Sequence, residues 1–198
     1  GTQEVVGTTF IDDCQWDRLS EYTGTTGWTH DAVNGCLNPA ATRVLSPTGI
    51  QLGDGIYELE FDAVNLGTET YRYVDLGFCM MDNTYSHGDD IDGYKVRINV
   101  SPGIVEIMKK SGQIASASYA LSAGTHKLTV VYISPVIRVY IDGVLIRTYS
   151  DPSPIASGYF GVARAGFTTL RYTRIMAIAV SPDATNGIAA CIPPIGGG

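Results

Sequence analysis

The sequence predicts an all-β fold in which two antiparallel sheets pack face to face. Apolar and polar residues alternate in many short runs that are rich in β-branched and aromatic types. Gly, Pro, Asn and Asp bound these runs at a spacing of about ten residues. No segment has a convincing helical period, and only residues 13–22 could form one turn. Regular short strands without intervening helices are typical of two-sheet sandwiches.

The clearest strand covers residues 55–64. Tyr57, Leu59 and Phe61 share one face of it, whereas Glu58 and Glu60 share the other. The other main strands are predicted at residues 8–12, 43–46, 71–81, 94–100, 104–109, 127–133, 136–142, 144–147, 158–163 and 170–180. We expect twelve apolar side chains to be buried: Leu59, Phe61, Leu76, Phe78, Val96, Ile98, Leu128, Val130, Val139, Ile141, Phe160 and Val162.

Length and charge limit the possible roles. The chain has 198 residues, which suits one sandwich domain, and 44% of them are hydrophobic, enough for a sizeable core. Its formal net charge is −7, and its basic residues are scattered, so nucleic acid is not an expected partner. No run of 18 apolar residues occurs, and we therefore expect no membrane insertion.

Composition also suggests the domain boundaries. Residues 1–7 are expected to form an N-terminal extension, residues 8–181 the sandwich, and residues 182–198 a tail with the Pro/Gly-rich composition of a linker.

Two of the four cysteines flank one polar, Gly-rich segment. A disulfide between Cys14 and Cys36 would close a loop of about 22 residues and would contribute roughly 3 kcal/mol. We expect that bridge, with two free buried thiols as the alternative. Cys79 lies in an apolar strand and could be part of the core. Cys191 could pair with Cys79, pair with another molecule, or stay free.

The order of these elements resembles that of a known superfamily. The runs His126–Tyr132, Ile137–Gly143, Gly158–Val162 and Arg174–Val180, with Phe10–Asp13, Tyr57–Asp62 and Gly93–Ile98 before them, resemble the concanavalin A-like superfamily of jelly-roll sandwiches. They are also similar to laminin-G-like domains and to the 3-keto-disaccharide hydrolase-like family of bacterial extracellular proteins. The resemblance covers about residues 8–181 and implies a secreted or cell-surface protein. It does not choose among the lectins, carbohydrate-binding modules, glycosidases, adhesion domains and filament or viral components of the superfamily.

A row of carboxylates on the clearest strand is a candidate for hydrolysis. Glu58, Glu60 and Asp62 line one strand face, and glycosidases need two carboxylates at comparable separations. Laminarinase-like enzymes of the superfamily carry a related pattern with another order of Glu and Asp. The order found here departs from that pattern, so we expect a solvated strand surface without catalysis.

The acidic loop, residues 82–92, is a candidate calcium site. Hard oxygen ligands suit Ca²⁺, and the spacing is not that of an EF-hand. The candidate ligands are Asp82, Asp89, Asp90 and Asp92. The resemblance implies a second possible calcium position near Asp12 or Asp13, because related sandwiches often hold calcium between their first and last strands. A solvated acidic loop is the alternative.

Tyrosines beside this loop suggest a sugar-binding surface, because tyrosine offers both a flat apolar face and a polar tip. By strand parity Tyr71, Tyr73 and Asp75 lie opposite the aliphatic face and should be exposed. The candidate ligand-binding residues are Tyr71, Tyr73, Asp75, Tyr85, His87 and Tyr94.

These observations favour a non-catalytic extracellular module that binds carbohydrate or a surface glycan, or serves adhesion, with calcium as a possible structural ion. A structural subunit of a surface filament, virion or tail fibre, which would self-assemble through strand edges, is the first alternative. A glycoside hydrolase is the second.

Overall fold

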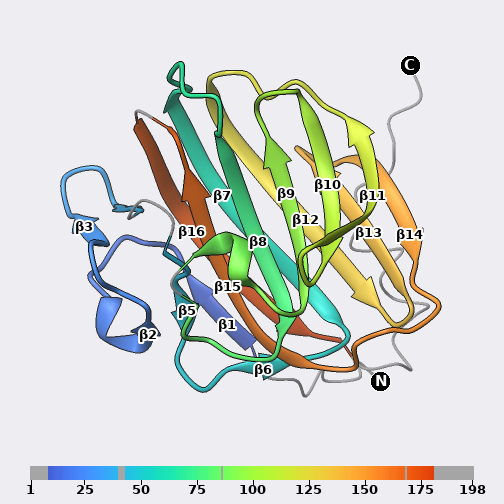
Figure 1. Ribbon diagram of the computed structural model, residues 1–198. Coiled ribbons are helices and arrows are strands. Elements are labelled where there is room, and N and C mark those ends of the chain that lie inside the picture. Colours follow the sequence, from blue (N-terminus) through green and yellow to red (C-terminus); the bar gives the residue numbers. More distant parts are fainter. Residues whose placement is uncertain (1–8, 40–42, 86, 168, 181–198) are drawn as a thin grey trace, which may run out of the picture.

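Two antiparallel sheets stacked face to face make up the computed structural model of the chain (Figure 1). The structure describes residues 9–39, 43–85, 87–167 and 169–180. The described residues contain strands and two short 3-10 turns but no α-helix, which confirms the all-β sandwich. The expected extension at residues 1–7, the tail at residues 182–198 and Cys191 lie outside the described residues.

The strands are short at the N-terminal side and long in the body of the sandwich. Their bounds are β1 Thr9–Asp12, β2 Tyr22–Thr23, β3 Thr29–Asp31, β4 Cys36–Asn38, β5 Ser46–Pro47, β6 Gln51–Leu52, β7 Gly55–Asn65, β8 Tyr73–Met80, β9 Tyr94–Asn99, β10 Ile104–Lys109, β11 Gly112–Ser118, β12 Gly124–Ile133, β13 Val136–Ile141, β14 Val144–Ser150, β15 Gly158–Ala165 and β16 Thr169–Ala179. The 3-10 turns are η1, Leu19–Glu21, and η2, Gly88–Asp90.

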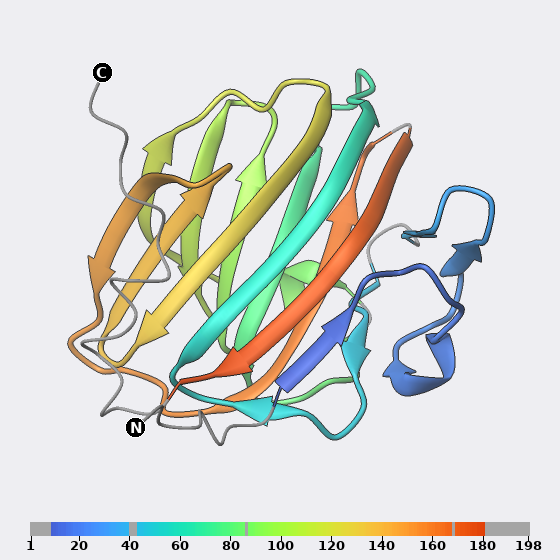
Figure 2. The same ribbon diagram turned by 180° about the vertical axis from the view of Figure 1, so that it is seen from behind.

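The strands divide between two main sheets. The eight-stranded sheet has the order β14-β13-β12-β7-β16-β4-β3, with β1 paired to β16. The six-stranded sheet has the order β11-β10-β9-β8-β15-β6, and β2 and β5 form a small ribbon. Figure 1 looks onto the six-stranded sheet, and Figure 2 shows the eight-stranded sheet from behind, with β2 and β3 projecting to one side of both.

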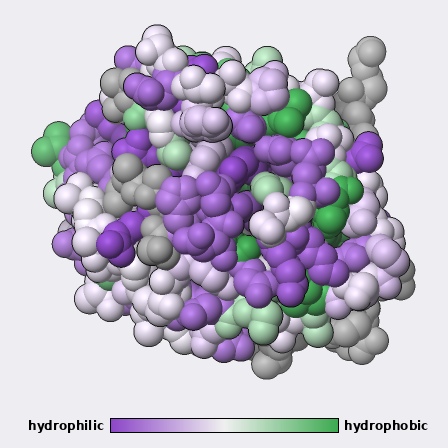
Figure 3. Space-filling model, viewed as in Figure 1, coloured by the Kyte–Doolittle hydropathy of each residue, from purple (hydrophilic) through white to green (hydrophobic). Residues whose placement is uncertain are grey.

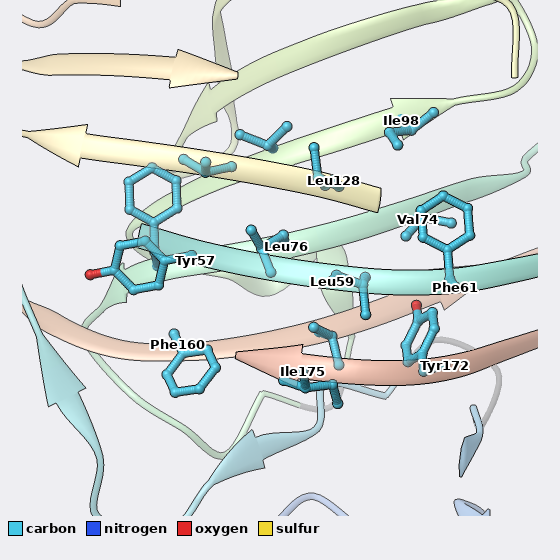
Figure 4. Packing of buried hydrophobic residues seen from close by; sticks show 14 of the residues in the cluster. Tyr57, Leu59, Phe61, Val74, Leu76, Ile98, Leu128, Phe160, Tyr172 and Ile175 are labelled. Atoms are coloured by element: carbon cyan, nitrogen blue, oxygen red, sulfur yellow. The ribbon is translucent and has the colours of Figure 1, made fainter. Parts of the chain in front are cut away.

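Strand parity determines the core. Along β7 the odd-numbered residues from Tyr57 to Ala63 are fully buried, while the residues between them are half-buried. Side chains from the facing strand β8, such as Leu76, interdigitate with them (Figure 4). All twelve side chains predicted to be buried are at most 2% exposed, which confirms the predicted core.

An aromatic cluster occupies the centre of the core and includes one residue predicted to bind ligand. The ring of Phe78 lies 5.2 Å from Tyr57, 5.2 Å from Tyr94 and 5.6 Å from Tyr132, measured between ring centroids. Tyr94 is fully buried, and its hydroxyl donates a hydrogen bond to Asp151. The prediction of Tyr94 as a surface residue is therefore wrong, because it shares the inward parity of Val96 and Ile98 on β9.

The predicted Cys14–Cys36 disulfide is absent. Both residues, and Cys79, are buried free thiols. The segment is held by other contacts: the Asp12 carboxylate accepts a hydrogen bond from the Cys14 backbone amide, and the Gln15 side chain donates through Nε2 to the Gly35 carbonyl. Burial raises the pKa of both the Cys14 and Cys36 thiols, so they resist ionisation.

None of the helical segments in the described part of the chain is long and apolar enough to cross a membrane.

Candidate functional site

The outer face of the six-stranded sheet, which points away from the core, carries a regular array of side chains. Because residues in register on neighbouring strands lie side by side, the array consists of rows that cross five strands. Read from β15 to β11, three rows are Ala165–Tyr73–Asn99–Ile104–Ser118, Ala163–Asp75–Arg97–Glu106–Ser116 and Gly161–Gly77–Lys95–Met108–Gln113.

A buried ion pair stands at the centre of this array. Arg97 Nε and Nη2 donate to the two carboxylate oxygens of Asp75, each over 2.7 Å, and Nη2 also donates to Asp89 Oδ1 over 2.6 Å. Asp75 is fully buried, and Arg97 is only 9% exposed. Burial raises the pKa of Asp75, and the hydrogen bonds and charge of Arg97 oppose that rise. The two-point contact fixes the plane of the guanidinium group.

One edge of that guanidinium group stays available. Among the described residues, no group accepts a hydrogen bond from Arg97 Nη1. Arg97 therefore offers an oriented donor on the outer face of the sheet.

Tyr73 lies directly below the guanidinium group. Its ring centroid is 3.5 Å from Arg97 Cζ, a close cation–π contact. The side chain is 4% exposed, and its hydroxyl makes no hydrogen bond of ordinary geometry with the described residues. Burial raises the pKa of this phenol, and the nearby Arg97 opposes that rise. A buried hydroxyl without a partner is costly, and such a group commonly satisfies itself with a water molecule or a ligand.

The acidic loop folds back over one side of the array. Lys95 Nζ donates to the Gly88 carbonyl over 2.7 Å and lies 3.9 Å from Asp89 Oδ1. The close approach requires glycine, because a Cβ at position 88 would lie 2.7 Å from Asp75 Oδ2 and 3.4 Å from the Ala163 Cβ. In Figure 1 the short turn η2 of this loop lies in front of β15, beside β8.

The carboxylates of the acidic loop are not gathered around a common point. Asp82 accepts hydrogen bonds from the Asn83 and Thr84 amides, whereas Asp89 faces Arg97 and Lys95. Asp92 lies 3.7 Å from Lys110 Nζ, and Asp90 belongs to η2. The described residues contain no group of three His, Cys, Asp or Glu side chains that could hold a metal ion. Two basic side chains of β9, Lys95 and Arg97, pair with Asp89 of this loop instead.

The second proposed calcium position is also occupied by protein groups. Asp12 is 1% exposed and accepts hydrogen bonds from the Tyr22 hydroxyl and the Cys14 amide. Asp13 accepts a hydrogen bond from the Gln15 amide at the surface.

The predicted ligand-binding residues divide into three groups. Tyr73 and Asp75 lie on the outer face, as parity predicts, but the acidic loop and Arg97 bury them, so the prediction that they are exposed is wrong. Tyr71 is 79% exposed just before β8, and His87 accepts a hydrogen bond from the Asp89 amide beside the site. Tyr85 packs on a small apolar cluster next to the loop.

The structure adds four residues that the sequence analysis missed. Lys95, Arg97 and Asn99 alternate on the outward side of β9, and Asn99 Nδ2 donates to Glu106 Oε2 on β10. Their alternating polar character within an otherwise apolar strand was the available signal. Figure 3 shows hydrophilic residues gathered across the middle of this face.

The carboxylates of β7 lie on the other side of the molecule, on the outer face of the eight-stranded sheet. Glu58 accepts a hydrogen bond from the Thr129 hydroxyl and lies 3.8 Å from both Lys127 and Arg174. Glu60 lies 3.5 Å from Arg174, and Asp62 is opposite Arg171 and Thr125 in the sheet register. Cations on the neighbouring strands thus balance this row, as expected of a polar strand surface.

Comparison with known proteins gives no matching family model and no matching curated sequence. Among solved structures, a β-glucanase from Bacillus licheniformis aligns with a TM-score of 0.61 at 10% identity, over 87% of this chain and 98% of that one. The carbohydrate binding module CBM66 from Bacillus subtilis gives 0.57 at 14% identity, over 81% and 96%. The exoplasmic/lumenal domain of VIP36, in a form bound to Ca²⁺ and Man2, gives 0.60 at 14% identity, over 90% and 91%. At such identities the likeness concerns the fold alone, and the chain is a jelly-roll sandwich of the concanavalin A-like type.

Proposed function

We propose that the protein is a non-catalytic extracellular module that binds a neutral carbohydrate on the outer face of its six-stranded sheet. The observation that carries the proposal is the pair of unused polar groups at the centre of that face. Among the described residues, neither the buried Tyr73 hydroxyl nor Nη1 of Arg97, whose guanidinium group stacks on the Tyr73 ring, has a hydrogen-bond partner. A sugar hydroxyl both donates and accepts hydrogen bonds and can therefore bond to Arg97 Nη1, and it reaches the buried Tyr73 hydroxyl when the side chains that cover it shift on binding.

The charge around these groups favours a neutral ligand over an anionic one. The carboxylates of Asp75, Asp89 and Glu106 slightly outnumber the two cations, Lys95 and Arg97. An acidic sugar would therefore meet no excess of positive charge, whereas fixed carboxylate, amide and guanidinium groups suit uncharged hydroxyls. Solved structures of carbohydrate-binding and lectin domains with the same fold support this ligand class.

The proposed site is suited to binding rather than to hydrolysis. Asp75 is fully buried and holds Arg97 through both of its oxygens, so its carboxyl group is occupied in orienting Arg97 and is not exposed to a ligand as an acid or base. The β7 carboxylates face basic partners on the opposite surface of the molecule. The likeness to a β-glucanase supports the fold and gives no specific reason to assign an acid and a base here.

The test compares single variants on a panel of immobilised neutral glycans. Tyr73→Phe should weaken binding roughly three- to tenfold, the equivalent of about one hydrogen bond. The same change should leave the melting temperature unchanged or higher, because it removes a buried hydroxyl that has no partner among the described residues.

Tyr71→Ala probes the rim of the site, where the exposed ring could stack on a sugar. It should weaken binding, while its matched control Tyr140→Ala, on β13 in the other sheet, should not. Binding that is unaffected by both Tyr73→Phe and Tyr71→Ala, or a wild-type protein that retains none of the glycans, would contradict the proposal.

Calcium removal gives a second prediction. Because Asp89 is paired with Lys95 and Arg97, and no three carboxylates converge in the described residues, chelation should change neither the melting temperature nor glycan binding. Differential scanning calorimetry with and without a chelator measures the first effect. A clear loss of stability on chelation would restore a structural role for calcium in this chain.

A further inference from the structure

The ordered acidic loop limits how a glycan can lie on the outer face of the six-stranded sheet. The strip of side chains that crosses β15, β8, β9, β10 and β11 would by itself be open at both ends. Its β15 side is closed by the acidic loop together with a small apolar cluster. We call this pair of features the wall and define it by Val44, Met80, Gly88, Asp89 and Ile91.

The wall packs directly on the sheet because two facing glycines leave room for it. Gly77 and Gly161 are opposite each other in the register of β8 and β15. A Cβ at Gly77 would lie 2.6 Å from the Met80 sulfur and 3.2 Å from Ile91 Cδ1. A Cβ at Gly161 would lie 2.9 Å from Val44 Cγ1. No sugar can occupy this part of the strip while the wall is in place.

The wall is also anchored by charge. Asp89 is bound to Arg97 over 2.6 Å, and the Gly88 carbonyl accepts a hydrogen bond from the fully buried Lys95 ammonium. Removing the wall would expose the Asp75–Arg97 pair and would leave Lys95 without its carbonyl partner. Both losses make displacement of the wall by a passing glycan chain unfavourable.

The Tyr73 hydroxyl and Arg97 Nη1 belong to residues that lie next to the wall. Arg97 and Tyr73 belong to the rows that the wall partly covers, and Asn99 and Glu106 continue those rows on the uncovered strands β9 and β10. A ligand that reaches Arg97 Nη1 must therefore approach from the β10 side and stop against Asp89.

From this arrangement we infer that the site binds the terminal unit of a glycan chain and not an internal stretch. The inference rests on the proposed glycan binding at this face. The terminal sugar abuts the wall and contacts Arg97 and Tyr73, while the rest of the chain leaves across β10 and β11. A chain that crossed the strands and continued past its bound unit in both directions would collide with the acidic loop.

The test measures binding capacity before and after chain shortening. The probes are mixed-linkage β-glucan, mannan and galactan, each used intact and after partial acid hydrolysis with the chain ends counted chemically. Terminal recognition predicts that the amount of protein bound per gram of polymer at saturation rises in proportion to the number of ends. A capacity that stays constant or falls on hydrolysis overturns the inference but leaves glycan binding intact. Failure to bind any probe in either form overturns the proposed function itself.

A pair of loop variants tests the wall separately. Asp89→Ala removes the contact with Arg97 and should raise the capacity of the intact polymer, because internal units then gain access. Asp82→Ala, which alters only an exposed turn of the same loop, is the matched control and should behave as wild type. If the wild type and both variants bind the intact polymer with equal capacity, the inference that the wall excludes internal units is contradicted.

Discussion

At the residue scale, the Asp75–Arg97 pair is the most costly feature of the candidate site. Both groups are buried on the outer face of a sheet, where side chains are more often solvated. Buried ion pairs add little net stability compared with apolar residues, but breaking one by removing a single partner is strongly destabilising. Such a pair is therefore better explained by the need to orient Arg97 than by the need to stabilise the fold.

This leads to a prediction for Arg97→Met. The variant leaves the Asp75 carboxylate buried without its cation and should lose about 3–5 kcal/mol of unfolding free energy at neutral pH. Its Asp75 pKa should lie even further above the ordinary value, so the folded state would bind a proton more tightly than the unfolded state. Stability of the variant should therefore increase as the pH falls towards about 4.

Urea unfolding across this pH range tests the prediction for Arg97→Met. The double variant Asp75→Val/Arg97→Met should recover most of the lost free energy of unfolding. A single variant that unfolds like wild type would show that the pair is not buried in solution.

At the element scale, most long strands were predictable from sequence, whereas β11 at the edge of the six-stranded sheet and the site itself were not. The alternation in β7, β8 and β9 predicted both their positions and their inward residues, including the core that contains Leu59, Phe78 and Val96. Strands of two or three residues, such as β2 and β3, have no measurable period and were missed. The docking of the acidic loop was also missed, because it depends on glycines at positions 77, 88 and 161 that meet only in three dimensions.

That docking gives a prediction for Gly88→Val. A branched side chain at this position collides with Asp75 Oδ2, which Arg97 holds in place, so the loop should lift from the sheet. Amide hydrogen exchange of residues 82–92 should accelerate, while exchange in β7 and β12 should stay slow. Gly112→Val, in the edge strand β11 where an added Cβ meets only the Lys109 carbonyl at 3.6 Å, is the control. Unchanged exchange in the loop would mean that Gly88 does not lie against the sheet.

At the scale of the whole molecule, several tyrosines are buried beside an aliphatic core. Burial raises the pKa of each of these phenols, namely Tyr22, Tyr57, Tyr73, Tyr94, Tyr132 and Tyr172. A folded-state pKa above the ordinary tyrosine value of 10.0 contributes stability that is fully present below that pH and is lost as the pH rises further. We therefore predict cooperative alkaline unfolding above about pH 10, in which tyrosinate absorbance and loss of β-sheet circular dichroism rise together. If the tyrosinate absorbance saturates before the circular dichroism changes, the prediction of cooperative alkaline unfolding is contradicted.

The central claim is that glycans bind on the outer face of the six-stranded sheet, at the foot of the acidic loop. Mapping amide chemical shifts of the labelled protein by NMR, during titration with a glycan that the panel identifies, tests this claim most directly. The account predicts that the largest shifts fall in residues 71–75, 87–90, 95–99 and 104–106, with the β7 residues Glu58 and Glu60 unaffected. Shifts concentrated on the outer face of the eight-stranded sheet, or in the loops around β2 and β3, would contradict it.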